Sequence, residues 1–255
     1  MVKVKKIKFR FYGYLNDFIK LAKTNNLEID VGPYYIHYYK GRQTVKDRIE
    51  SLGIPHPEIA MILKNGEAVN FSYLVQPDDF FSVYPYLYNF KLPAAKLLLP
   101  EFPAKPRFIL DVHLGRLARY LRRFGFDTAY RNDYQDREIV DQAVAEKRII
   151  LSRDLGLLRR KRVKWAKFIW NDDPKKQLQE VFERYQLAES YEGESRCVNC
   201  NSELEKIAKE EIIERLEPKT KKYFDDFRYC SSCDKIYWRG SHYQRTEKLL
   251  DKLLH

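Results

Sequence analysis

Four cysteines form two closely spaced pairs in the last quarter of the chain. Two residues separate Cys197 from Cys200 and Cys230 from Cys233, and 29 residues lie between the pairs. Two such C-x-x-C knuckles supply four thiolates, the ligand set that holds a tetrahedral Zn²⁺ in structural sites. Because all four cysteines are needed to complete this set, we predict a structural zinc with no open coordination position. The polar segment around the pairs has few core residues and needs such a cross-link.

Other uses of the cysteines are weaker interpretations. The N-terminus alternates charged with apolar residues and has no export signal, which disfavours disulfides. A redox role for either pair, and His242 as a substitute zinc ligand, are the alternatives. The spacing between the pairs exceeds that of an ordinary zinc ribbon, which predicts an inserted helix over residues 207–216.

Three aspartates are expected at strand ends or at the start of a helix in the middle of the chain. Asp111 and Asp154 each follow a short apolar run, and Asp136 opens the helix predicted between them. In a parallel α/β sheet the functional crevice lies at the carboxyl ends of the strands. Carboxylates gathered there repel one another unless a cation is present, and oxygen ligands suit Mg²⁺ or Mn²⁺. We therefore predict a metal site that activates water beside a phosphate.

Each of these acids also has an ordinary structural interpretation. Asp136 suits a helix cap, and Asp111 and Asp154 suit turns at strand ends. Glu138 is more typical of a solvated helix residue than of a metal ligand.

Basic residues flank the three aspartates. Arg116, Arg119 and Arg123 recur on one face of the helix that follows Asp111, and a second cluster follows Asp154. Arginine forks bind phosphate well, so both groups favour a track for a nucleic-acid backbone, although a solvated basic face is the alternative. Trp165 is more typical of core than of a base-stacking residue. The expected substrate-binding residues are Arg116, Arg119, Arg123, Ser152, Arg153, Arg159, Arg160 and Arg162.

Charge and composition agree with this interpretation. The chain has 255 residues and a formal charge of +11. Residues 101–180 carry 19 basic and 12 acidic side chains, whereas residues 181–255 carry 14 and 15. The basic excess is therefore greatest around the aspartates. No apolar run is long enough to span a membrane, and we expect a soluble, cytoplasmic protein without membrane contact.

The first segment has the pattern of a small β-grasp domain. Residues 2–11 alternate apolar with charged side chains as a half-buried strand does. A helix is predicted over residues 44–52, ending at Gly53, and apolar strands at residues 59–63 and 80–84 follow it. Several prolines, Pro93 among them, then mark a linker.

The second segment alternates strands with helices, which predicts a parallel α/β sheet. Strands are expected at residues 108–112, 148–152 and 167–170, with helices at residues 113–124, 136–147 and 174–187. A helical tail is expected over residues 246–254. The predicted boundaries are 1–88 for the β-grasp domain, 89–106 for the linker, 107–190 for the α/β domain and 191–255 for the zinc ribbon and tail.

The second and third segments resemble the Mut-seven C-terminal ribonuclease family. The resemblance rests on Ile109-Leu110-Asp111, Asp136-Arg137-Glu138, Leu151-Ser152-Arg153-Asp154, the cysteine pairs and Tyr237-Trp238-Arg239-Gly240-Ser241-His242. It implies a PIN-like α/β domain with an appended zinc ribbon, and metal-binding acids at Asp111, Asp136 and Asp154. PIN nucleases often have a fourth acid, for which Asp172 or Asp173 is the candidate here. Residues 1–88 resemble the family's ubiquitin-like companion domain, but they lack the Gly-Gly end of a sulfur carrier.

Together these observations predict a metal-dependent ribonuclease with Mg²⁺ or Mn²⁺ in an acidic site and a structural Zn²⁺. RNA is the expected partner, and a protein partner for the β-grasp domain is a further expectation. The first alternative is an RNA- or ribosome-associated binding module with little or no catalysis. A toxin-like nuclease held by an antitoxin is the other.

Overall fold

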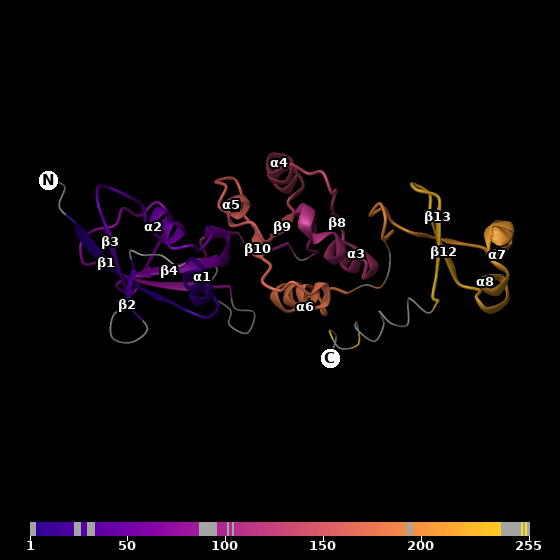
Figure 1. The fold of residues 1–255 in the computed structure, drawn as a ribbon, viewed down its shortest axis with the longest axis horizontal. Helices are drawn as coiled ribbons and strands as arrows, with labels where there is room; N and C mark the ends of the chain where they lie inside the picture. Colours follow the sequence, from indigo (N-terminus) through magenta and orange to yellow (C-terminus); the bar gives the residue numbers. More distant parts are fainter. Residues whose placement is uncertain are drawn as a thin grey trace. The chain divides into compact units, whose positions relative to one another are not determined.

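The structure is a computed structural model that describes residues 4–22, 27–29, 34–86, 96–100, 102–103, 105–191, 193, 196–240, 251 and 253 (Figure 1). The chain divides into two compact units. One comprises residues 1–103 and 136–168, and the other residues 104–135 and 169–255. Pro93 of the predicted linker and most of the predicted tail helix lie outside the described residues. Within the described residues, no helix has both the length and the apolar character to cross a membrane.

The N-terminal segment confirms the predicted β-grasp fold. Its six strands have the spatial order β2-β3-β1-β6-β4-β5. The two central strands, β1 and β6, run parallel, whereas β1 with β3 and β4 with β6 run antiparallel. The strands are β1 Lys5–Phe11, β2 Leu27–Ile29, β3 Tyr35–Tyr39, β4 Ile59–Lys64, β5 Glu67–Val69 and β6 Phe80–Pro85.

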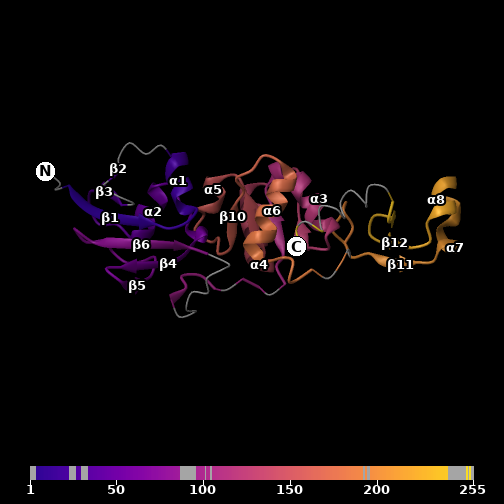
Figure 2. The ribbon, with the colours of Figure 1, turned by 90° about the horizontal axis from the view of Figure 1, so that it is seen from below.

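Two helices cover one face of this sheet. The helices are α1 (Leu15–Ala22), which the sequence analysis missed, and α2 (Val45–Ser51), which it predicted. Figure 2 shows β1, β6, β4 and β5 side by side in this order. Thr44 and Asp47 cap the start of α2 reciprocally, because the Thr44 hydroxyl accepts from the Asp47 amide and the Asp47 carboxylate accepts from the Thr44 amide. The alternating residues Ile7, Phe9 and Phe11 of β1 are buried beneath these helices.

The central segment confirms the predicted parallel pairing and helix order. β7 (Phe108–Leu110) pairs in parallel with β8 (Thr128–Ala129), and β9 (Ile149–Ser152) pairs in parallel with β10 (Ala166–Phe168). Its helices are the 3-10 turn η3 Val112–Leu114, α3 Gly115–Arg123, α4 Asp136–Glu146, α5 Leu155–Leu158 and α6 Pro174–Tyr185. The first predicted strand ends two residues early because Asp111 starts η3. The two-residue strand β8 and the one-turn helix α5 were not predicted.

The C-terminal segment is a three-stranded antiparallel sheet of order β11-β12-β13. The predicted helix over residues 207–216 is wrong in extent. β11 (Glu205–Ile207) precedes it, and the helical part divides into α7 (Lys209–Ile212), η4 (Ile213–Arg215) and α8 (Pro218–Tyr223). Pro218 starts α8 and separates it from the preceding turn. This insertion has its own small core of Ile212, Leu216 and Phe227 before β12 (Phe227–Cys230) and β13 (Lys235–Trp238) complete the sheet.

Within the first unit, the β-grasp segment covers the free edge of β10. The Phe168 amide donates to Glu58 Oε1 at 2.6 Å, and the Tyr14 hydroxyl donates to Glu58 Oε2 at 3.0 Å. His56 Nε2 lies 2.8 Å from the Val163 carbonyl oxygen. Glu58 and His56 belong to the buried turn η1 (His56–Glu58). An edge strand leaves amides without ladder partners, and here a carboxylate of another segment accepts from one of them.

Replacing Glu58 tests this edge contact. We expect Glu58→Ala to lower the free energy of unfolding by about 2 kcal/mol, because two buried donors lose their acceptor. Urea unfolding of the full chain measures the effect. Glu67→Ala, at an exposed position of β5, is the matched control, and equal midpoints for the two variants would contradict the role given to Glu58.

Candidate functional site

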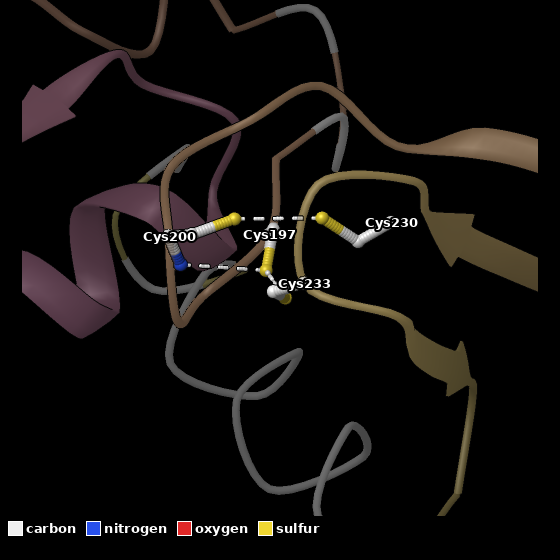
Figure 3. A group of neighbouring side chains, drawn as sticks. All are labelled: Cys197, Cys200, Cys230 and Cys233. Carbon is white, nitrogen blue, oxygen red and sulfur yellow. Dashed lines mark hydrogen bonds between the residues drawn. The ribbon is translucent and has the colours of Figure 1, made fainter.

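The four cysteine thiols converge as predicted (Figure 3). Their sulfur atoms all lie within 4.8 Å of one another. Cys200 Sγ is 3.4 Å from Cys230 Sγ, and Cys197 Sγ is 3.4 Å from Cys233 Sγ. A tetrahedron of sulfurs around Zn²⁺ has edges of about 3.8 Å, given a Zn–S bond of about 2.3 Å. The cluster therefore fits a zinc ion. Among the described residues it is the one group of three or more His, Cys, Asp or Glu side chains close enough together to hold a metal ion.

The two knuckles have the same backbone form. Asn201 and Asp234 each follow the second cysteine of a pair, and both have positive φ, 73° and 57°. Their amides donate to the carbonyl oxygens of Cys197 and Cys230, the first cysteine of each pair, at 2.9 Å. Asn and Asp tolerate this left-handed backbone better than most residues. The residue after each pair therefore fits the turn that folds the two thiols toward one side.

Electrostatics within the cluster favours a bound cation. Burial raises the pKa of the Cys200 thiol, but hydrogen bonds with Ser202 and neighbouring thiols outweigh it and set the pKa to about 6. Burial and the neighbouring thiols raise the pKa of Cys233 to about 12. One thiol of the cluster thus ionises easily and another resists. Four thiolates need a cation to coexist at this separation. The alternative ligand His242 lies outside the described residues.

The first knuckle is fastened to the segment around α3 by a buried arginine. Arg122 is 5% exposed, and its Nη1 donates to the carbonyl oxygens of Asn199 at 2.8 Å and Val198 at 3.4 Å. Its Nε donates to Thr128 O at 2.8 Å, and its Nη2 donates to Tyr130 O at 3.3 Å. The planar fork of arginine suits such divergent acceptors. Burial lowers the pKa of Arg122, and the nearby thiols oppose that shift.

Asn201 adds a second attachment between the same two segments. Its Oδ1 accepts from the Thr128 amide at 2.9 Å, and its Nδ2 donates to Asp127 Oδ1 at 2.8 Å. Thr128 belongs to β8. The Asn201 side chain therefore accepts from a strand amide, as a backbone carbonyl group of a neighbouring strand would. Arg122 and Asn201 together fix the knuckle on α3 and β8.

A basic groove of about 630 Å³ lies where these segments meet. Arg116 and Arg119 are exposed and form no hydrogen bond or ion pair with any described residue. The Tyr237 hydroxyl lies 3.0 Å from Cys197 Sγ, so the cysteine cluster supports one wall of the groove. Burial and the bond with Cys197 raise the pKa of Tyr237. The lining residues are Arg116, Arg119, Tyr120, Arg123, Asp173, Pro174, Lys175, Val198, Asn199, Lys235 and Tyr237.

The structure thus brings the predicted arginines of α3 together with cations that the sequence analysis did not assign. Lys175 lies at the start of α6, which packs against α3, and Lys235 opens β13. Neither side chain has an acidic partner among the described residues. Lys235 is an isolated cation in the sequence, so only its place in the fold connects it to the groove. Asp173, a candidate fourth acid, accepts from the amides of Lys175 and Lys176 as the cap of α6.

Asp111 lies at the head of the helix whose arginines line the groove. It is 7% exposed and directly follows β7, and its Oδ1 accepts from the Val112 amide at 2.6 Å. The Tyr130 hydroxyl donates to Val112 O at 2.9 Å across the start of α3. A side chain at Gly115 would come within 2.6 Å of that hydroxyl, so glycine permits this close packing. The turn that presents Asp111 is therefore fixed by neighbouring contacts.

Asp136 and Asp154 belong to the first unit, whereas Asp111 belongs to the second. Asp154 is exposed and caps α5, where its Oδ1 accepts from the Gly156 amide at 2.6 Å. Asp136 is the first residue of α4 and accepts from Arg160 Nη2 at 2.8 Å. The Ser152 hydroxyl oxygen accepts from the Asp154 amide at 2.8 Å. Asp111 and Asp154 cap the short helical turns that follow their strands, as expected of turn residues at strand ends. Asp136, for which a helix cap was the structural alternative, is instead the first residue inside α4 and pairs with Arg160.

The arginines that follow Asp154 differ from Arg116 and Arg119 of α3, because two of them pair with acids. Arg160 binds Asp136, and Arg162 binds Asp141. Arg153 and Arg159 are half-buried. Trp165 is half-buried and is not part of the core that was expected for it, and its Nε1 donates to the Pro100 carbonyl oxygen at 2.9 Å. Glu138 and His113 are exposed.

A mixed α/β fold with a ubiquitin-like first domain, a parallel central sheet and a four-cysteine ribbon defines a recognisable class of protein. The Mut7-C RNase domain family model matches residues 106–250, and the Mut7-C ubiquitin family model matches residues 4–91. The first match covers more than half of the chain, and the chain belongs to the Mut7-C family. Comparisons with curated proteins and with solved structures gave no match. Family membership supports a ribonuclease-like enzyme.

Metal analysis tests the cysteine cluster. We expect one zinc ion per chain in purified protein and none in Cys233→Ser, because three thiolates hold the ion less well than four. Elemental mass spectrometry measures the content. Ser232→Ala, at an exposed position in the same turn, should keep its zinc. A wild-type protein without stoichiometric zinc would contradict the site.

Replacing Arg122 tests the attachment of the knuckle. We expect Arg122→Ala and Arg122→Lys both to destabilise the protein by about 3 kcal/mol, because buried carbonyl groups lose their donors and lysine cannot reach all of them. Amide exchange over residues 197–201 should accelerate in both. Arg119→Ala, an exposed change on the same helix, should move stability by less than about 0.5 kcal/mol. Unchanged exchange at the knuckle would show that other contacts hold it.

Proposed function

We propose that the protein is a metal-dependent ribonuclease that hydrolyses phosphodiester bonds of RNA. The observation that carries this proposal is the arrangement on α3. A buried carboxylate, Asp111, caps the turn η3 that leads into α3, and Arg116 and Arg119 of α3 line a basic groove without a partner among the described residues. An acid that can hold a divalent cation and cations that can hold phosphate thus lie within one short stretch of chain. Membership of the Mut7-C RNase domain family supports the same function.

The metal in this proposal is Mg²⁺ or Mn²⁺, held by Asp111, Asp136 and Asp154. The donor chemistry fits, since all three supply carboxylate oxygens, which hard divalent ions prefer. Asp154 uses Oδ1 for its cap, and Oδ2 forms no hydrogen bond with a described residue. Such an ion, when bound, lowers the pKa of water and neutralises charge on the phosphate.

The groove supplies the binding part of the proposed reaction. Arg116 and Arg119 present guanidinium groups that can grip phosphate oxygens in pairs, and Lys175 and Lys235 add point charges. Because these groups have no acidic partners among the described residues, phosphate need not displace an existing ion pair. The protein's role is thus to hold the backbone and exclude alternative orientations of the scissile phosphate.

The binding-module alternative also has a specific observation in its favour. Asp136 is paired with Arg160, so one of the three proposed metal ligands has its charge neutralised by the protein itself. A chain that keeps this pair would bind RNA through the basic groove without an acidic metal site. The two functions differ in what happens when the acids are removed.

Isosteric replacement of the acids distinguishes the ribonuclease from the binding module. We expect Asp111→Asn and Asp154→Asn to cleave single-stranded RNA at least about a hundredfold more slowly in Mn²⁺, because several kcal/mol of metal-dependent stabilisation is lost. RNA affinity should change little. Asp133→Asn, an exposed acid paired with Arg131, is the control and should cleave normally. Cleavage by Asp111→Asn at the wild-type rate, or no cleavage by wild type, would overturn the proposal in favour of the binding module.

A further inference from the structure

The outer face of the β-grasp sheet has an unusual composition. Residues of β1 alternate strictly, with Ile7, Phe9 and Phe11 buried toward the helices. The outward positions of the same strand are Lys6, Lys8 and Arg10. Both lysines are exposed, and Arg10 is half-buried. Three cations therefore follow one another along a central strand, on the face opposite the buried side chains of Ile7, Phe9 and Phe11.

Aromatic rings flank these cations on both neighbouring strands. Register places Tyr38 of β3 beside Lys6 and Phe80 of β6 beside Lys8. At the end of β1, Tyr12 stacks on Tyr84 with ring centroids 4.3 Å apart and planes 10° apart.

Arg10 connects the rings into one surface. Its guanidinium carbon lies 4.8 Å from the centre of the Tyr12 ring and 5.7 Å from the centre of the Tyr34 ring. Tyr34 in turn packs edge-on against Phe80 at 5.6 Å. Cation–π contacts of this kind order the rings, so the surface needs little rearrangement to receive a flat ligand.

The outward positions of the two central strands contain no acid. They are Lys6, Lys8, Arg10, Phe80, Ser82 and Tyr84. Positive charge interleaved with half-exposed rings matches a polymer with a negative backbone and flat bases. It does not match an apolar protein surface, which would take these charges out of water at a cost in free energy.

We infer that the outer face of the β-grasp sheet, formed by β3, β1 and β6, binds single-stranded RNA. Unpaired bases stack on the tyrosine rings and on the Arg10 guanidinium, and the phosphates lie along Lys6 and Lys8. A duplex keeps its bases stacked on each other, so the face discriminates against it. The surface shares no residue with the α3 groove, and the inference shares with the proposed function only its substrate class. Residues 1–100 carry 14 basic and 9 acidic side chains, and the inference gives a role to this basic excess.

Fluorescence anisotropy with a labelled 12-nucleotide single-stranded RNA tests the inference on the full-length Asp111→Asn protein. We expect Tyr84→Ala to bind about tenfold more weakly, because one stacking partner is lost, and Tyr84→Phe to bind like the parent. Lys6→Gln/Lys8→Gln should reduce the slope of log K against log salt by about 1.4, the value for two phosphate contacts to a single strand. The same losses should persist when Arg116→Gln/Arg119→Gln disables the groove.

Lys20→Gln/Lys46→Gln is the matched control, with the same charge change on the two helices of the opposite face. The inference is overturned if Tyr84→Ala binds RNA like its parent, if the control pair weakens binding as much as the face pair, or if duplex RNA shows the same dependence. If Tyr84→Ala does not fold, the salt dependence of RNA binding by Lys6→Gln/Lys8→Gln decides whether the face binds RNA. Weakened binding by face variants of a protein that cleaves no RNA would leave this inference standing and remove the proposed function. Cleavage by wild type, together with unchanged RNA binding by the face variants, would overturn this inference and leave the proposed function standing.

Discussion

The guanidinium of Arg122 joins two parts of the second unit that are far apart in the sequence. It is buried and donates to carbonyl oxygens on both sides, at Thr128 and Tyr130 and at Val198 and Asn199. A buried cation without acceptors costs several kcal/mol, so either side is unstable without the other. The cysteine cluster fixes the shape of the knuckle that offers half of these acceptors. The cysteine cluster, the position of the knuckle and the wall of the basic groove are therefore linked through one side chain.

Burial alone separates the roles of the arginines on α3. Arg122 faces inward and holds the fold together, whereas Arg116 and Arg119, on the exposed side of the same nine-residue helix, have no described partners. The same contrast holds between the two basic clusters, because Arg160 and Arg162 are already paired with acids. Net charge therefore does not show where phosphate binds. The positive potential available to a ligand is that of the cations left without acidic neighbours.

Local patterns in the sequence predicted the features that depend on neighbouring residues. Alternation predicted β1, apolar residues at helical spacing before Gly53 predicted α2, and the cysteine spacing predicted the convergence of the four thiols. Contacts between distant segments were beyond such patterns, since nothing near Lys235 or Glu58 indicates that one lines the groove and the other accepts from the edge of β10. The short elements β8 and α5 were missed because two to four residues give no measurable period. In the insertion, the helix predicted over residues 207–216 began inside β11, and α8, which starts at Pro218, was not predicted.

Photocrosslinking tests the central claim most directly, namely that α3 and the zinc ribbon together form one RNA-binding groove. Tyr120 of α3 and Tyr237 of β13 both line the groove and can be mapped by mass spectrometry after irradiation with 4-thiouridine RNA. In the Asp111→Asn protein both tyrosines should carry adducts. In the same protein with Arg122→Ala, the Tyr237 adduct should disappear while the Tyr120 adduct remains. Equal Tyr237 adducts with and without Arg122, or adducts at neither tyrosine, would contradict the account.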